Sequence, residues 1–443
     1  MGLFGQGQPA AALPWFDQAL LLDPRSAAAQ HFKGYALCQL GRFDEGVPLM
    51  ERSVAAQPRN GDFVGNLGMI QYVMGDVPAA IATLERAVRI APGAPEPYSN
   101  LAMALRDVGE PDRALVAARR ALQLRPEYPA ARLNLALALL ATGQWDAAWE
   151  AYTWRPDPRV NLRDLGIAPT LAHATRIADS VQGEWLTLHG EQGLGDAIFF
   201  MRWAALLRAR GARLRFWGDA RLGRIFLRSG LVDAAVGGNE PPPDTVPERL
   251  VWIGDLPALA GKASPFPAPA RLVPDAARLA AMREGLASLG PAPHIGITWR
   301  AGLPRAGKAV LAKVVDPAAL GAALRGSRAT LVSLQRDPVA GEARALAQAL
   351  ARPLADLSAA NADLEAMLAL MEALDDYVAV SNTNVHLRAG LGKPTRVLVP
   401  WPAEWRWTRS AERSPWFPDC PLYRASTDGR WDAALGRLAA DLG

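Results

Sequence analysis

The sequence predicts an α-solenoid followed by an α/β region that consists of two doubly wound halves. Three observations predict this fold class. Proline and glycine recur every 34 residues in the first third of the chain, strand-like and helix-like segments alternate afterwards, and a proline-rich interval at 257–274 divides that second part. A chain of 443 residues has room for roughly two to four domains. With 50% hydrophobic and 21% charged residues, it is typical of a folded globular protein, which excludes a largely disordered one.

The repeats are defined by residues with simple structural roles. Prolines stand 34 residues apart at Pro24, Pro58, Pro92 and Pro126, and glycines keep the same period at Gly7, Gly41, Gly75, Gly109 and Gly143. Small residues recur where two helices would cross, at Ala12, Gly46, Ala80, Ala114 and Ala148. Glycine permits the tight turn after a first helix, the small residue lets the paired helices approach, and proline ends the second helix. The pattern resembles the tetratricopeptide repeat, a helix-turn-helix unit, and predicts a repeat array over residues 1–155.

The two ends of the array carry separate expectations. Counting the period backwards places Met1 inside the first helix of repeat one, so only its second helix, Pro9 to Leu22, is complete and should expose a face. Either the chain starts further upstream or another surface covers this edge. At the other end Val160 stands where the next proline is due, so the array should stop near residue 155. Such arrays form a concave groove that binds an extended peptide or another protein; the alternative is that the array only docks on the following domain.

The remaining chain is divided by its pattern into a linker and two α/β halves. Residues 156–182 lack sustained periodicity and predict a linker. The first half, residues 183–274, has expected strands at 184–189, 212–217, 232–236 and 250–253, with helices at 196–210 and 221–229. The second half, residues 275–443, has expected strands at 294–299, 329–334, 377–381 and 395–399, with helices at 317–324, 342–351 and 364–373. Ligands of two such parallel sheets should lie at the carboxyl ends of the strands, in the cleft between the halves.

Three loops at strand ends carry residues suited to chemistry. The first, residues 189–196, places Gly193 and Gly195 before a helix, where close backbone approach is possible. It lacks the third glycine of a dinucleotide fingerprint and the lysine of a phosphate loop. Its distinctive residue is Asp196, a carboxylate at the helix start that faces the expected cleft. The alternative role for Asp196 is an N-cap.

The second and third loops lie in the second half. Thr298 and Arg300 end a strand and are followed by Arg305 and Lys308, so the cations suit a diphosphate; a solvated basic loop is the alternative. The third loop joins a strand to a helix and contains Ser381, Asn382, Thr383, Asn384 and His386. Hydroxyl and amide groups beside a helix N-terminus make a second anion site. His386 either donates to a phosphate or packs inside the helix.

Five runs of sequence carry a further family resemblance: HGEQGLGDAIFFMRW (189–203), SLQRD (333–337), VSNTNVHLRAGLGKP (380–394), WPAEWRW (401–407) and SPWFP (414–418). They resemble bacterial proteins that join tetratricopeptide repeats to a glycosyltransferase of the heptosyltransferase type. That family has the GT-B fold, in which two Rossmann-like halves surround a cleft, and is similar in arrangement to O-linked N-acetylglucosamine transferase. The resemblance covers nearly the whole chain.

The resemblance implies a role for each loop. The second half would hold a nucleotide-sugar donor and the first half the acceptor. Asp196 would take the proton from an acceptor hydroxyl, while Arg300 and Lys308 stabilise the departing diphosphate. The diphosphate site would be completed by Thr298, Ser381, Asn382, Thr383, Asn384 and His386, and the acceptor loop would comprise Glu191, Gln192, Gly193 and Gly195. Gln335 would lie near the nucleoside.

One departure from the family pattern bears on activity. Many relatives carry Asp-Thr-x-x-x-His in the third loop, whereas this chain has Ser381 and Asn382 at the first two of those positions. An uncharged loop can still hold phosphate, but the change leaves catalysis, or the identity of the donor, open.

Several classes of function are not expected. Asp-x-Asp is absent from the sequence, and the two cysteines, Cys38 and Cys420, form no Cys/His ligand set, so no metal is expected, and no cofactor beyond the substrate nucleotide sugar. The net charge of +4 comes without a basic block, so nucleic acid is not an expected partner. No apolar stretch approaches the ~20 residues of a membrane span, and the N-terminus lacks a secretory signal, which favours the cytoplasm. Trp405 and Trp407 are expected to pack the C-terminal segment rather than to stack on sugars.

The sequence therefore predicts a cytoplasmic, metal-independent glycosyltransferase whose repeat array recruits a protein or glycan acceptor. Inversion at the sugar carbon is implied by the resemblance alone. The alternative from another class is a degenerate transferase domain that binds a nucleotide or glycan without turnover, as part of a repeat-mediated binding module. A pure assembly scaffold without a small ligand is the third possibility.

Overall fold

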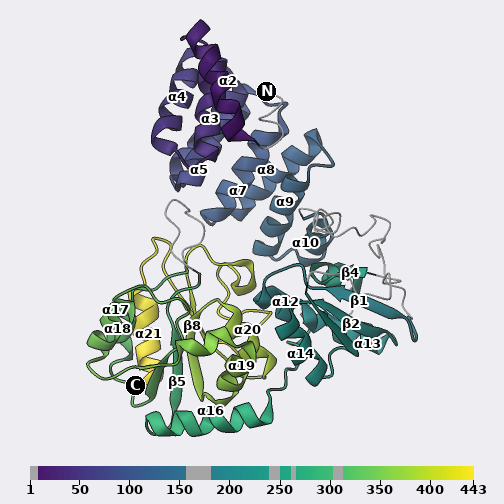
Figure 1. Cartoon of the computed structure of the whole chain (residues 1–443), viewed down its shortest axis with the longest axis vertical. Helices are drawn as coiled ribbons and strands as arrows, with labels where there is room; N and C mark the ends of the chain where they lie inside the picture. The colour runs from purple at the N-terminus through teal and green to yellow at the C-terminus, as the bar shows by residue number, and fades with distance from the viewer. Residues whose placement is uncertain (1–7, 156–180, 239–249, 261–265, 303–312) are drawn as a thin grey trace. The chain divides into compact units, whose positions relative to one another are not determined.

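The computed structural model describes residues 8–155, 181–238, 250–260, 266–302 and 313–443 (Figure 1). Contacts divide these residues into a helical unit that ends at Thr142 and an α/β unit that begins at Gly143. Arg305, Lys308 and residues 156–180 of the expected linker lie outside the described residues.

The helical unit is a series of antiparallel helix pairs at the predicted period. Its helices are α2 (Pro9–Leu22), α3 (Ala27–Gln39), α4 (Phe43–Ala56), α5 (Gly61–Met74), α6 (Val77–Ile90), α7 (Pro95–Asp107), α8 (Pro111–Leu124) and α9 (Pro129–Ala141). The turn after each first helix contains a glycine with positive φ, which is 81° at Gly41, 96° at Gly75 and 83° at Gly109. Each recurring proline follows the end of a second helix by two residues, as expected from its lack of a backbone N–H.

Close helix contacts explain the small residues of the repeat. A Cβ atom added to Gly46 would lie 2.5 Å from the Cys38 sulfur, and one added to Gly34 would lie 2.6 Å from the Gly46 carbonyl oxygen. Ala80 and Ala114, at the equivalent position of later repeats, are fully buried. The helices of a pair can approach this closely only because no larger side chain stands at the crossing.

Polar contacts between successive repeats are periodic too. First helices are joined by hydrogen bonds between residues 35 apart, such as Asn134 Nδ2 to the Ser99 carbonyl (2.9 Å). A second helix is also joined to the turn that follows the preceding second helix, through residues 28 apart: Arg86 of α6 donates to the Pro58 carbonyl (2.9 Å). These contacts fix neighbouring repeats in the same register.

The first described helix exposes apolar side chains. On α2, Ala12 and Phe16 are buried against α3, whereas Trp15 is 65% exposed, Leu21 81% and Leu22 90%. The exposed face expected for this helix is therefore present.

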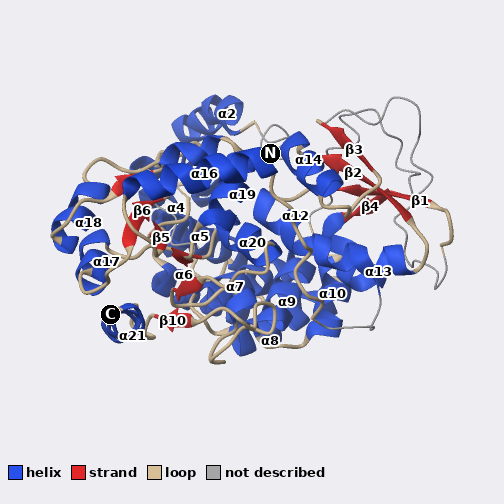
Figure 2. Cartoon of the chain, turned by 90° about the horizontal axis from the view of Figure 1, so that it is seen from below, coloured by secondary structure: helices blue, strands red, loops and turns tan. Residues whose placement is uncertain are grey.

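The α/β unit begins with α10 (Trp145–Tyr152) and contains two separate parallel sheets (Figure 2). The first sheet has the strand order β3-β2-β1-β4 and is made of β1 (Trp185–His189), β2 (Arg213–Gly218), β3 (Ala234–Gly237) and β4 (Leu250–Trp252). Its helices are α12 (Leu194–Phe200), α13 (Ala204–Ala209), α14 (Ala220–Arg228) and α15 (Leu256–Ala260). The expected helix at 196–210 is thus divided by a 3₁₀ turn at Met201–Trp203.

The second sheet has the strand order β10-β9-β8-β5-β6-β7. Its strands are β5 (His294–Thr298), β6 (Thr330–Ser333), β7 (Ala355–Asp356), β8 (Asp376–Val380), β9 (Arg396–Val399) and β10 (Leu422–Arg424). Its helices are α16 (Ala276–Leu289), α17 (Pro317–Leu324), α18 (Glu342–Leu350), α19 (Leu364–Ala373), α20 (Thr383–Gly390) and α21 (Asp432–Leu442). Helices α17, α18 and α21 pack on one face of this sheet, and α19 and α20 lie on the other (Figure 1).

Candidate functional site

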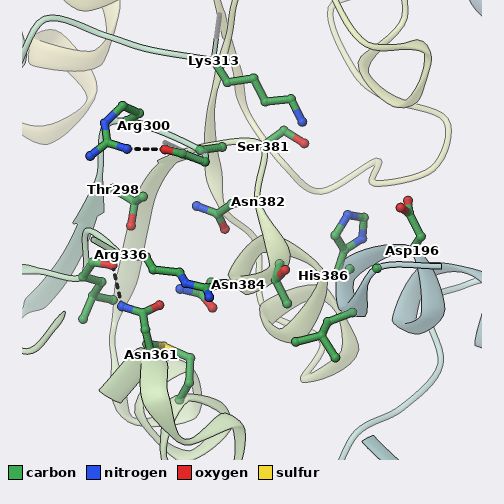
Figure 3. Close-up of a pocket in the computed structure, with 18 of the residues that line it drawn as sticks. Asp196, Thr298, Arg300, Lys313, Arg336, Asn361, Ser381, Asn382, Asn384 and His386 are labelled. Carbon is green, nitrogen blue, oxygen red and sulfur yellow. Dashed lines mark hydrogen bonds between the residues drawn. The ribbon is translucent and has the colours of Figure 1, made fainter. Parts of the chain in front are cut away.

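A pocket of about 340 Å³ lies where the two halves of the α/β unit meet. In the second sheet it adjoins the carboxyl ends of β5 and β8, neighbouring strands from which the chain winds in opposite directions. Open α/β sheets bind ligands at this kind of switch point. Most of the predicted site residues line the pocket: Gly193, Gly195, Asp196, Thr298, Arg300, Ser381, Asn382, Thr383, Asn384 and His386 (Figure 3).

The first half contributes the start of α12. Gly193 precedes the helix in an extended conformation (φ −63°, ψ 161°), so Asp196 is the third helical residue and the N-cap alternative for Asp196 is wrong. Gly195 faces α20: a Cβ atom there would lie 3.0 Å from the His386 ring and 3.5 Å from Thr383. Glycine at this position allows α12 and α20 to touch, which places Asp196 and His386 next to each other (Figure 3).

Asp196 forms an ion pair with Arg406. The Asp196 side chain is 38% exposed, whereas that of Arg406 is only 11% exposed. The guanidinium lies against the rings of Phe199 (4.7 Å) and Trp405 (4.3 Å), an arrangement that holds the cation in place. Arg406 was not predicted as a site residue, and its position within the WPAEWRW run is the one sequence signal that pointed to it.

A second ion pair joins Glu404 to Lys313 at the same pocket. Burial raises the pKa of Glu404, but Lys313 and Arg406 more than offset this effect, and the Ser381 hydroxyl also favours the charged form, so the pKa is below its usual value. Glu404 is therefore an ionised carboxylate at neutral pH. Neither Glu404 nor Lys313 was predicted, because neither belongs to a recognisable motif.

A buried tyrosine joins the second and third loops beneath the pocket. The Tyr377 hydroxyl lies 2.8 Å from Thr298 Oγ1 and accepts a hydrogen bond from Asn382 Nδ2 (3.1 Å). Asn382 Oδ1 accepts from the Val385 N–H (3.2 Å) and thereby caps the N-terminus of α20. Asn382 is therefore oriented by both contacts.

His386 lies in α20 and is 6% exposed. Burial, followed by the nearby charges of Arg406, Arg202 and Lys313, holds its pKa well below the usual value, so the imidazole is neutral at pH 7. Its Nδ1 atom is buried and has no hydrogen-bond partner among the residues that the structure describes. The ring thus packs within the helix, as one sequence alternative expected, and it also lines the pocket; donation to a phosphate stays a prediction.

Arg300 is occupied by protein groups although it lines the pocket. Its guanidinium forms two hydrogen bonds with the Glu342 carboxylate (3.1 and 3.0 Å) and donates to the carbonyl oxygens of Asp337 and Gly302. Only 2% of the side chain is exposed. The charge of Arg300 is therefore already compensated within the protein, and its role in binding a diphosphate stays a prediction. Arg336, whose side chain is 75% exposed, is a more accessible cation of the pocket lining.

Of the predicted site residues that the structure describes, Gln335, Glu191 and Gln192 do not line the pocket. The Gln335 side chain is fully used by the backbone: it accepts from the N–H groups of Trp299 (3.2 Å) and Arg300 (2.9 Å) and donates to the Arg300 carbonyl (3.0 Å). Glu191 and Gln192 also turn away, towards the end of α10. Gln335 was predicted to lie near the nucleoside, and Glu191 and Gln192 near the acceptor. In the structure all three side chains bind other parts of the protein instead of facing the pocket.

Glu191 belongs to a buried ion cluster that anchors α10. Arg155 pairs with both Glu191 and Asp255, and all three side chains are 8% exposed or less. Glu191 also accepts from the N–H groups of Ile253 (3.1 Å) and Gly254 (3.2 Å). This cluster holds the loop that leads to Gly193 and Asp196 against the end of α10.

Aromatic rings pack the other side of α10. Trp149 lies within about 6 Å of the rings of Phe200, Trp203, Trp405 and Trp416, measured between centroids. Trp407 is fully buried and stacks on Phe417 at 5.0 Å. Neither Trp405 nor Trp407 lines the pocket, so their packing role agrees with the sequence interpretation.

Within the described residues, no group of three His, Cys, Asp or Glu side chains is placed to hold a metal ion. None of the described helices has the length and apolar character needed to cross a bilayer. Cys38 and Cys420 are buried free thiols, and burial raises the pKa of each to about 11.

Comparison with known proteins identifies the helical part of the chain. Models of the tetratricopeptide repeat match residues 2–46, 33–95 and 105–152. The helical pairs are tetratricopeptide repeats. The last of these matches includes α10, which by its contacts belongs to the α/β unit.

Individual relatives are more distant. Protein FlbA of Caulobacter vibrioides is 27% identical over 321 residues, which cover 66% of this chain and 52% of FlbA. The chain thus spans about half the length of this curated relative. Among solved structures, PilF of Pseudomonas aeruginosa is 20% identical over 36% of this chain and 76% of its own, with a TM-score of 0.33. A tetratricopeptide-repeat protein of Thermus thermophilus is 23% identical, and the match covers 37% of this chain and 91% of the other. Its TM-score is also 0.33.

Proposed function

We propose that this chain is a glycosyltransferase of the GT-B arrangement, which moves a sugar from a nucleotide-sugar donor to a protein or glycan acceptor. The observation that carries the proposal is a single pocket that combines Asp196 from the first half with polar residues at the carboxyl ends of β5 and β8. The second sheet supports it, because its strands follow the order 3-2-1-4-5-6 when numbered along the chain from β5, which is the order of a Rossmann sheet.

The proposed reaction uses Asp196 as the general base. Its carboxylate takes the proton of an acceptor hydroxyl while the hydroxyl oxygen attacks the anomeric carbon, and the bond from that carbon to the diphosphate oxygen breaks. The departing diphosphate carries the electron pair away and is stabilised by the positive N-terminal end of α20 and by the side chains of Asn382 and Thr383. No step requires a metal ion.

The pocket also suits the nucleoside part of a donor. Its volume of about 340 Å³ falls within the usual range for ligand sites, about 300–1,000 Å³. Leu334, Leu364 and Met367 supply an apolar wall on the side of the second sheet, where a base can be buried. The tetratricopeptide repeats would recruit the acceptor, since their concave surfaces commonly bind extended peptides.

The test is thermal unfolding of the chain with UDP, GDP, ADP and dTDP, with CMP, and with a sugar nucleotide of each. A ligand at about 100 times its Kd adds about 2.7 kcal/mol to the stability, a shift that is readily measured. We expect one nucleotide class to raise the unfolding temperature and its sugar nucleotide to be turned over. Asp196→Asn should keep donor binding and lose turnover by about 10²-fold or more. No shift with any of these compounds would refute the proposal.

A second candidate function is supported by the ion pairs of the pocket. Asp196 is already bound to Arg406 and Arg300 to Glu342, an arrangement that suits a protein which binds a nucleotide or glycan without turning it over. For such a binding protein, a nucleotide sugar would stabilise the chain, but no product would form with any acceptor. Asp196→Asn would then have no turnover to reduce.

A further inference from the structure

The pocket contains a buried carboxylate that the proposed reaction does not use. Glu404 lines the pocket, and only 14% of its side chain is exposed. Lys313 pairs with its Oε1 atom, whereas Oε2 is buried and forms no hydrogen bond with the described residues, although the nearby Ser381 hydroxyl also favours the charged form of Glu404. A buried acceptor without a donor is costly, so such an atom commonly marks a place where a ligand supplies the donor.

Two more side chains of the same pocket have a buried nitrogen without a partner. These are Nδ1 of His386 and Nε of Arg406. His386 is 94% buried, and Arg406 uses Nη2 for its contact with Asp196, which leaves the Nε–H as an additional donor. The pocket therefore contains one strong acceptor, one charged donor and one imidazole nitrogen that form no hydrogen bond within the described part of the chain.

This combination selects among the parts of a nucleotide sugar. A diphosphate has no hydrogen to donate at neutral pH, and its charge is repelled by a carboxylate. A sugar hydroxyl, in contrast, donates to a carboxylate oxygen and accepts from N–H groups at the same time. Glu404, with its neighbours His386 and Arg406, is therefore complementary to hydroxyl groups rather than to phosphate.

We propose that Glu404 is the sugar-recognising residue of this pocket: its Oε2 atom accepts a hydrogen bond from a hydroxyl of the donor sugar, whose oxygen atoms are contacted by Arg406 Nε and His386 Nδ1. The inference rests on the proposed function, because it assumes that a nucleotide sugar occupies the pocket. It goes further by assigning the contact that distinguishes the sugar nucleotide from the bare nucleotide.

Glu404 has a second effect through Lys313. The ion pair with Glu404 compensates the charge of Lys313, so the lysine attracts a diphosphate less strongly than a free cation would. Glu404→Gln removes this charge while preserving the shape of the side chain. It should therefore weaken the contact with the sugar and, at the same time, leave Lys313 more available to the diphosphate.

The experiment is isothermal titration of the full chain and of Glu404→Gln with two probes. These are the nucleoside diphosphate and its sugar nucleotide that give the largest thermal shift in the panel described above. In the unchanged protein the sugar nucleotide should bind more tightly than the bare diphosphate. In Glu404→Gln the ratio of the two affinities should fall about tenfold, as expected from loss of a hydrogen bond to a charged group. The affinity of Glu404→Gln for the bare nucleoside diphosphate should equal or exceed that of the unchanged protein.

Glu412→Gln is the matched control, because Glu412 is exposed and lies in the same C-terminal segment outside the pocket lining. This variant should keep both affinities. Glu404→Asp retains the charge but shortens the reach, so it too should lower the ratio, and it replaces Glu404→Gln if that variant does not fold.

The outcomes separate the two proposals. An unchanged ratio in both Glu404 variants, with tight binding of the sugar nucleotide, overturns the assignment of Glu404 and leaves the proposed function standing. If none of the nucleotides binds the unchanged protein, the proposed function and this assignment both fail.

Discussion

At the scale of single residues, Gly195 shows how a small side chain sets the geometry of the site. Gly195→Ala would bring a Cβ atom to 3.0 Å from the His386 ring, so α12 and α20 would have to separate slightly. We expect a loss of about 1–3 kcal/mol in the free energy of unfolding, together with weaker ligand binding. Urea unfolding followed by tryptophan fluorescence measures the first effect.

Gly193→Ala provides the comparison for this prediction. The nearest atom to a Cβ at Gly193 is an oxygen of Asp196 at 4.0 Å, and the backbone there is extended, so alanine fits without strain. Its stability should stay within about 0.5 kcal/mol of the unchanged protein. Equal losses in the two variants would show that the contact with His386 is unimportant.

The residues of the pocket were predictable to different degrees. Asp196 and Ser381 follow strands at glycine-rich or polar turns, so their position at the carboxyl edge follows from local pattern. Glu404 and Arg406 come from a C-terminal segment without such a pattern, and only tertiary contacts bring them to Lys313 and Asp196. Gln335 was misplaced because a polar residue after a strand can turn towards its own backbone as readily as towards a ligand.

At the scale of the helices, His31 makes the repeat array sensitive to acid. The ring is inaccessible to solvent, and burial lowers its pKa from 6.5 to about 4. Ser53 gives its hydroxyl hydrogen to the Met50 carbonyl and so accepts from His31 Nδ1, while Nε2 faces the Asn66 amide nitrogen (3.1 Å). Both nitrogens of the neutral ring are thereby used, and an added proton would be unfavourable.

This histidine predicts a stability change of known sign. Because the folded pKa is lower than the unfolded one, the contribution of His31 is complete above pH 6.5 and is lost as the pH falls towards 4. Relative to His31→Gln, the unchanged protein should lose about 3 kcal/mol of stability between pH 7 and pH 4. Chemical unfolding followed by circular dichroism at both pH values measures the difference. Parallel pH profiles of the two proteins would contradict the assignment.

The ion cluster at the end of α10 makes a second prediction at this scale. Arg155→Met removes the guanidinium shared by the buried carboxylates of Glu191 and Asp255, and should destabilise the α/β unit by about 3–5 kcal/mol. Arg113 forms ion pairs whose side chains are about half exposed. Arg113→Met should therefore lower the free energy of unfolding by no more than about 1 kcal/mol. Thermal unfolding of the two variants compares them directly, and similar losses would argue against a special role for the buried cluster.

Elements with strong local signals were predicted well, and those without them were not. Helices α17 and α19 lie at the predicted bounds, and in the structure each is preceded by a capping aspartate, Asp316 or Asp363. The two-residue strand β7 and the edge strand β10 are too short for periodicity to show. Helix α16 was missed because it follows directly on the proline-rich interval, and only Leu286 of its side chains is buried, so it lacks a clear apolar face.

At the scale of the whole molecule, the two units should respond differently to a ligand. The described residues that line the pocket all belong to the α/β unit, and each repeat is stabilised mainly by its neighbours. A bound nucleotide sugar should therefore raise the unfolding temperature of the α/β unit and leave that of the repeats within about a degree. Scanning calorimetry combined with hydrogen exchange distinguishes the two transitions. An equal shift of both would show that the chain unfolds as one cooperative body.

The sequence repeat and the folding unit do not share a boundary. By its period α10 completes the last repeat, yet Trp149 and Arg155 are buried among residues of the α/β unit. A fragment cut at the expected linker, after residue 155, would therefore uncover Phe200 and Trp203 and separate Glu191 from its cation. If the array is exchanged between related proteins, in the laboratory or by recombination, a junction before Gly143 keeps α10 with the α/β unit. A junction after α10 would replace the residues that pack against this unit and should destabilise it.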